Sequence, residues 1–121
     1  MKTILVIEDT ENMLRMMSDL LSRSGYNVIS AVDGVQGVNS YRTSKPDLVI
    51  TDIIMPDKEG LEVIMELVRE TPRPKIIAMS GGGMMEPRTY LSLAEKLGAD
   101  AVLEKPFRPA ELLSLIEKVL S

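Results

Sequence analysis

The sequence has no cysteine and no histidine among its 121 residues. Disulfide bonds, thiolate nucleophiles, zinc sites built on these residues and Ser-His-Asp triads are therefore excluded. A bound metal ion would need oxygen ligands, which favours Mg²⁺, Mn²⁺ or Ca²⁺.

Long apolar runs and an excess of positive charge are also missing. No stretch approaches the roughly 20 apolar residues that cross a bilayer, and the first residues lead straight into a strand-like run without a signal-peptide cleavage site. The net charge of −4 opposes attachment to nucleic acid or anionic lipid. We therefore expect one soluble, cytoplasmic domain over residues 1–121, with no membrane or direct nucleic-acid partner.

Short apolar runs alternate with amphipathic segments along the whole chain, which favours an α/β fold with a parallel sheet covered on both faces. Strands are expected at 3–7, 26–31, 48–51, 75–79 and 101–103. Gly25 and Gly98 are expected to stop the first and fourth helices. The apolar positions expected on the helices are Met13, Leu14, Met17, Leu20 and Leu21; Val35, Val38 and Tyr41; Leu61, Ile64, Met65 and Val68; Tyr90, Leu93, Ala94 and Leu97; and Leu112, Leu113, Ile116, Val119 and Leu120.

Four of these runs end in residues that could act on a phosphoryl group: Glu8 and Asp9, then Asp52, Ser80 and Lys105. Successive strands of a parallel sheet point the same way, so residues just past each strand gather along one edge, where ligands bind. The pattern predicts that three carboxylates, a hydroxyl and an ammonium share one crevice.

Asp52 is the predicted nucleophile, because a carboxylate that attacks phosphorus forms an acyl phosphate. Taken alone, an aspartate after a strand is more often a turn residue, and Glu8 and Asp9 could simply be acids at a helix N-terminus. Together, however, the three acids would repel one another and raise their pKa values unless a cation sat among them. A divalent ion such as Mg²⁺ would resolve that conflict.

Lys105 and Ser80 also have ordinary alternatives. A lysine is usually solvated, but one placed directly after a strand and before Pro106 can reach phosphoryl oxygens and offset their charge. Ser80 precedes three glycines at 81–83, which give the loop many backbone states that a new hydrogen bond could select. The alternative is a loop whose motion is coupled to nothing.

Four motifs follow one another along the chain: Glu8-Asp9, Asp52-Ile53-Ile54-Met55-Pro56 with Gly60, Ser80-Gly81-Gly82 and Lys105-Pro106-Phe107. In this order, they resemble the receiver domain of response regulators in bacterial two-component signalling. The resemblance implies a flavodoxin-like (βα)5 fold with strand order 2-1-3-4-5. It also implies a cis peptide between Lys105 and Pro106.

The same resemblance implies a ligand set for Mg²⁺ or Mn²⁺. Asp9 and Asp52 would ligate directly, the backbone carbonyl of Ile54 would add a third oxygen, and Glu8 would act through water. Lys105 and Ser80 would contact the phosphoryl group.

The implied partners are a sensor histidine kinase or phosphotransfer protein as phosphoryl donor and an unknown downstream protein. Since the chain has no histidine, the phosphoryl group must arrive from outside. We expect a switch or relay that assists its own modification, not a conventional turnover enzyme, and a monomer or a phosphorylation-dependent dimer.

One residue departs from the family pattern: Val102 stands where receivers commonly carry Tyr or Phe. We therefore expect displacement of residues 80–97, and not ring rotation, to carry the output. Met84 and Met85 could provide an adaptable contact surface there or cap the following helix.

Other functions remain open at this point. The sequence ends with the last expected helix, which favours a receiver without an attached effector domain, but an excised receiver of a DNA-binding regulator or hybrid histidine kinase has the same pattern. An unphosphorylated pseudo-receiver that serves as an interaction scaffold is a further alternative. A phosphate-ester phosphatase is disfavoured because Ile54 replaces its general acid, and a flavin or dinucleotide module because the acidic turn at 8–11 would repel phosphate.

Overall fold

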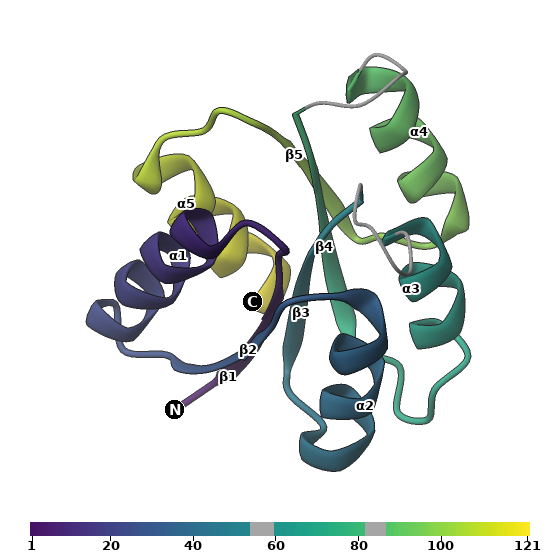
Figure 1. Ribbon diagram of the computed structural model, residues 1–121, viewed down its shortest axis with the longest axis horizontal. Helices are drawn as coiled ribbons and strands as arrows, with labels where there is room; N and C mark the ends of the chain where they lie inside the picture. The colour runs from purple at the N-terminus through teal and green to yellow at the C-terminus, as the bar shows by residue number, and fades with distance from the viewer. Residues whose placement is uncertain (54–59, 82–86) are drawn as a thin grey trace.

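The computed structural model describes residues 1–53, 60–81 and 87–121. Five strands alternate with five helices over these residues (Figure 1). The strands are β1 Thr3–Ile7, β2 Asn27–Ala31, β3 Leu48–Asp52, β4 Lys75–Ser80 and β5 Ala101–Glu104. The helices are α1 Glu11–Arg23, α2 Gly34–Ser44, α3 Gly60–Leu67, α4 Pro87–Leu97 and α5 Pro109–Leu120.

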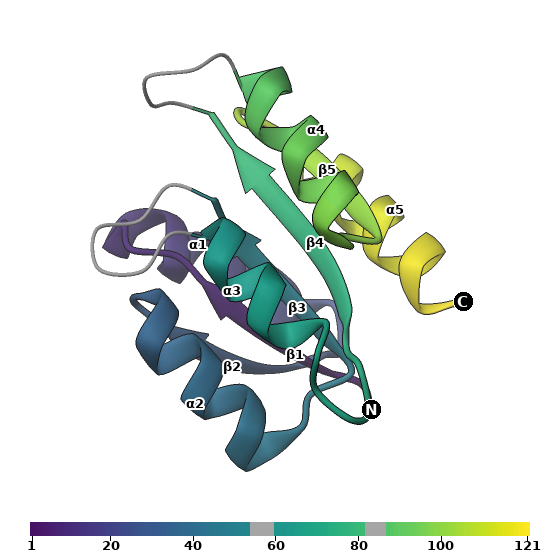
Figure 2. The ribbon, with the colours of Figure 1, turned by 90° about the vertical axis from the view of Figure 1, so that its right-hand side faces the viewer.

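The strands form one parallel sheet in the order β2-β1-β3-β4-β5, which confirms the predicted topology. Helices α1 and α5 cover one face, and α2, α3 and α4 cover the other (Figures 1 and 2). Successive side chains of a strand point to opposite faces, so Ile4 and Val6 pack with α1 and α5, whereas Leu5 and Ile7 pack with the other three helices. Burial on both faces explains why the central strands are continuously apolar.

The strand boundaries differ from the prediction where the site lies. Asp52 and Ser80 are the last residues of β3 and β4, and not the first residues of the following loops. The sheet ladder extends this far because Asp52 pairs with Met79 and Ser80 pairs with Glu104. The backbone of both residues is therefore fixed by pairing within the sheet.

Most of the apolar positions predicted on α3 and α4 pack into the core. Ile64 and Ala94 are buried, and Leu61, Val68 and Leu97 pack against the core.

The exceptions among the predicted apolar positions are Val35, Met65 and Leu93, which are 48%, 43% and 37% exposed. Apolar residues that are neighbours in the sequence lie about 100° apart on a helix, so packing on the sheet decides which of them points inward.

Gly25 and Gly98 end α1 and α4 as predicted, with φ angles of 95° and 122° that favour glycine. No helix among the described residues is long and apolar enough to cross a bilayer.

Candidate functional site

The predicted site residues described by the structure meet at the carboxyl edge of the sheet. Glu8 and Asp9 follow β1, Asp52 ends β3, Ser80 ends β4 and Lys105 follows β5. The strand arrows run in a common direction (Figure 2), so these positions fall at the same end of the sheet.

Lys105 lies between two of the acids. Its Nζ is 2.6 Å from Oε1 of Glu8 and 3.3 Å from Oδ2 of Asp52. Burial lowers the pKa of the Lys105 ammonium, but the hydrogen bond to Glu8 and the charges of Asp52 and Glu8 outweigh this and raise the pKa overall. The lysine is therefore a fixed positive charge at neutral pH.

The three carboxylates form one cluster. One oxygen from each of Glu8, Asp9 and Asp52 lies within 4.8 Å of the others. Glu8 and Asp52 are buried, whereas Asp9 is exposed. Desolvation, together with a hydrogen bond and charge repulsion from Glu8, raises the pKa of Asp9. An all-oxygen donor set that carries mutual repulsion fits Mg²⁺ or Mn²⁺, which bind one or two carboxylates and keep several waters.

Ser80 presents a buried hydroxyl at the end of β4, on the same edge of the sheet. Its Oγ is inaccessible to solvent and has no hydrogen-bond partner among the described residues. A buried polar group without a partner is costly, and in native proteins it calls for an explanation. An acceptor oxygen brought by a ligand would satisfy it.

The backbone behind Asp52 is closely packed against Gly60. A Cβ atom on Gly60 would lie 2.2 Å from the Asp52 carbonyl oxygen and 2.5 Å from Cα of Ile53. The Gly60 amide also donates to the Ile53 carbonyl at 2.7 Å. In the sequence Gly60 was only part of a family motif. The structure gives it a steric role that no local pattern indicates.

Thr51 was not among the predicted site residues. Its buried hydroxyl donates to the Asp52 carbonyl oxygen at 2.9 Å. The signal that could have identified it is a polar residue at the end of the apolar run 48–50, directly before Asp52.

Three other expectations have different outcomes. The Lys105–Pro106 peptide is cis, as the resemblance implied. Val102 is partly buried against the core that α2, α3 and α4 form with the sheet. Ile54, Met84 and Met85 lie outside the described residues, so the expected carbonyl ligand and the methionine surface stay predictions.

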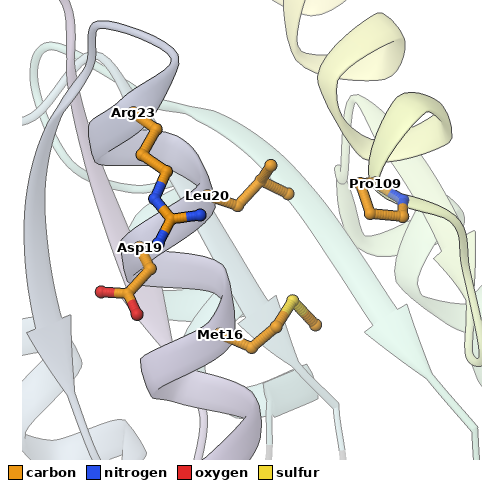
Figure 3. A pocket seen from close by; sticks show the side chains of 5 residues that line it. All are labelled: Met16, Asp19, Leu20, Arg23 and Pro109. Atoms are coloured by element: carbon orange, nitrogen blue, oxygen red, sulfur yellow. The ribbon is translucent and has the colours of Figure 1, made fainter.

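A hollow lies between α1 and the start of α5 (Figure 3). Figure 3 shows the residues that line it, and none of them is a predicted site residue; they are Met16, Asp19, Leu20, Arg23 and Pro109.

Comparison with known proteins agrees with this geometry. Residues 4–117 match the family model of the response regulator receiver domain. The chain is 34% identical over 119 residues to the chemotaxis protein CheY of Thermotoga maritima, covering 98% of this chain and 97% of that protein. It is 33% identical to the alkaline phosphatase synthesis transcriptional regulatory protein PhoP of Bacillus subtilis, where it spans 48% of the relative's length.

Solved structures give the same result. A response regulator receiver domain protein from Clostridium thermocellum superposes with a TM-score of 0.91 at 30% identity, covering 99% of this chain and 94% of that one. The chemotaxis protein CheY4 of Vibrio cholerae superposes with a TM-score of 0.87 at 25% identity, covering 99% of both chains. These neighbours confirm the flavodoxin-like receiver fold.

Proposed function

Because the chain belongs to the response regulator receiver domain family, we propose that it accepts a phosphoryl group on Asp52 and acts as a phosphorylation-dependent switch or relay. The family is a signalling family and not a classical enzyme family. The observation that carries the proposal is the convergence of Glu8, Asp9, Asp52 and Lys105 from three strand ends. The buried hydroxyl of Ser80, at the same sheet edge, has no partner among the described residues.

The proposed reaction is an in-line transfer from a phosphohistidine on a sensor kinase or phosphotransfer protein. A carboxylate oxygen of Asp52 forms a bond to phosphorus while the phosphorus–nitrogen bond of the donor breaks. The electron pair stays on the imidazole nitrogen, which takes up a proton from solvent. The products are an aspartyl phosphate on this chain and a neutral histidine on the donor.

The residues present fit the metal on which receiver domains generally depend, Mg²⁺. Asp9 and Asp52 would hold it, with Glu8 acting through water and the Ile54 carbonyl as a further ligand. When bound, the ion would supply positive charge to the transferring phosphoryl oxygens.

The chain's own groups then have separate tasks. The Lys105 ammonium already lies 3.3 Å from an Asp52 oxygen, so it is placed to pair with a phosphoryl group attached there. The buried Ser80 hydroxyl gains an acceptor when such a group arrives. Both interactions form only after transfer, so each would favour a different arrangement of its strand end in the modified protein.

The output would pass to a downstream protein or to a second copy of the chain. The chain spans nearly all of CheY but about half of PhoP, a transcriptional regulator. We place the single-domain switch first, in the cytoplasm, with the receiver of a larger regulator or hybrid kinase as the alternative. Since Val102 has no ring to rotate, displacement of residues 80–97 would carry the signal.

A beryllofluoride titration followed by backbone NMR tests this function. With Mg²⁺ present, the amide signals of Asp52, Ser80 and Lys105 should shift to a new, saturable position. Without Mg²⁺, or in Asp52→Asn, they should stay in place. Equal shifts in Asp52→Asn would reject Asp52 as the acceptor, and no shift in the native sequence would favour the pseudo-receiver.

A further inference from the structure

The side chain of Lys105 is held along its whole length. Its backbone amide donates to the Ser80 carbonyl at 2.9 Å. Its aliphatic stem passes against Gly81, and its ammonium ends between Glu8 and Asp52. Such a path leaves the lysine few alternative rotamers, since the side chain is only 18% exposed.

The ammonium is held more tightly by Glu8 than by Asp52. The distance of 2.6 Å from Nζ to Glu8 Oε1 is at the short end for a charge-assisted hydrogen bond, whereas 3.3 Å to Asp52 is long. Glu8 is itself fixed, because its other oxygen accepts a hydrogen bond from the Thr10 amide at 3.0 Å and the side chain is fully buried. One carboxylate oxygen thus faces the helix start and the other faces the lysine.

Gly81 leaves the room that the lysine stem needs. A Cβ atom there would lie 2.4 Å from Cβ of Lys105 and 3.3 Å from its Cα and Cδ. Cβ is bonded to the backbone and cannot swing aside as a side-chain tip can. A methyl group at position 81 would therefore push the whole lysine off its path.

We infer that Glu8 is a positioning residue for Lys105, and that Gly81 supplies the clearance that lets the ammonium reach it. In the resting protein Glu8 neutralises the ammonium, so the Asp52 carboxylate keeps more of its negative charge for attack on phosphorus. The lysine also starts within one short movement of the oxygen that would carry the phosphoryl group. This functional consequence rests on the proposed phosphorylation of Asp52, but the positioning itself does not.

This role is separate from a contact to a metal through water. A water-mediated ligand would leave Lys105 unaffected when the Glu8 charge is removed in the absence of metal. A positioning residue would release it. The two roles therefore predict different behaviour of one ammonium group.

The test is NMR of the lysine side-chain ammonium groups in the full chain, with neither metal nor phosphoryl donor present. We expect one ammonium signal protected from exchange with water, identified by its loss in Lys105→Met. In Glu8→Gln and in Gly81→Ala, hydrogen exchange of that group should accelerate more than about tenfold, as expected for loss of a charge-assisted hydrogen bond. Backbone spectra verify that each variant is folded.

Glu11→Gln is the matched control. It removes one negative charge from an exposed acid three residues from Glu8 that is paired with Arg15 at 3.2 Å. The protected signal should persist there. An unchanged Lys105 signal in either Glu8→Gln or Gly81→Ala, or no protected signal in the native sequence, would overturn the inference. Neither result depends on whether Asp52 is phosphorylated.

Discussion

Replacement of Gly60 by alanine tests how the backbone of Asp52, the proposed nucleophile, is held. The new Cβ would lie 2.2 Å from the Asp52 carbonyl oxygen, 2.5 Å from Cα of Ile53 and 2.9 Å from the Asp52 carbonyl carbon. All three are backbone atoms of a buried strand end, so the clash cannot be relieved by turning a side chain. The substitution must move either the start of α3 or the backbone of Asp52 itself.

The expected cost follows from these contacts. Overpacking typically costs about 1–3 kcal/mol, and a backbone clash belongs at the upper end of that range. Weakening the Gly60 to Ile53 hydrogen bond adds about 1 kcal/mol, and the better helix propensity of alanine returns somewhat less than about 1 kcal/mol. The free energy of unfolding should fall by about 3 kcal/mol. With a urea m-value of about 2 kcal/mol/M, the unfolding midpoint falls by roughly 1.5 M.

Gly37→Ala is the matched control in the same urea assay, followed by circular dichroism. Its Cβ would lie 2.3 Å from Cδ1, 2.8 Å from Cγ1 and 3.3 Å from Cγ2 of Ile7, all of them side-chain atoms and none of them backbone. The gain in helix propensity, about 1 kcal/mol in mid-helix, offsets much of that clash, so the loss should stay below about 1.5 kcal/mol. A loss under about 1 kcal/mol for Gly60→Ala, or equal losses for both variants, would refute the reasoning.

Three further predictions concern the charged cluster and the hydroxyl. The raised pKa of Asp9 means that its ionised form costs stability at pH 7 and that this cost disappears as pH falls through the raised pKa. Asp9→Asn should therefore raise the urea midpoint at pH 7 without Mg²⁺, and this increase should become smaller at acid pH. Mg²⁺ should stabilise the native sequence more than the variant. A lower midpoint for Asp9→Asn at pH 7 would contradict this. Lys105→Met leaves the buried Glu8 carboxylate without its cation, so the free energy of unfolding should fall by about 3–5 kcal/mol at pH 7. In the double variant with Glu8→Gln, the free energy of unfolding should fall by less than the sum of the losses in the two single variants. Strict additivity in that double-mutant cycle would argue against the pair. Ser80→Ala removes a hydroxyl without a partner among the described residues, so the urea midpoint of this variant should equal or exceed that of the native sequence. The amide shifts of the variant with beryllofluoride should be smaller. A clearly lower midpoint would show that the hydroxyl already has a hydrogen-bond partner.

The alternation of strands and helices and the placement of the candidate site residues at one sheet edge followed from short-range patterns, whereas the strand order 2-1-3-4-5 came from the resemblance to receiver domains. Continuous apolar runs mark strands buried on both faces, and the residues after them must share one sheet edge. Asp52, Ser80 and Lys105 were placed at this edge in this way. The exposure of Met65 and Leu93 was not predicted, because each has a buried apolar neighbour in the sequence and only packing on the sheet decides which of the two points inward.

The internal geometry of the site could not be derived from the sequence. The ion pair between Glu8 and Lys105 joins residues 97 positions apart. The Lys105 ammonium lies closer to Glu8 than to Asp52, at 2.6 Å against 3.3 Å, and so small a difference cannot be read from a sequence. The roles of Gly60 and Gly81 depend on what lies opposite a missing Cβ atom, which only the folded backbone determines.

The position of the phosphoryl group can be mapped after incubation with a small-molecule phosphoryl donor and Mg²⁺. Borohydride reduction converts an aspartyl phosphate to homoserine, which peptide mass spectrometry locates. We predict homoserine at position 52, dependent on Mg²⁺ and absent from Asp52→Asn. Homoserine at another aspartate of the native sequence, or no modification with Mg²⁺ present, would contradict it.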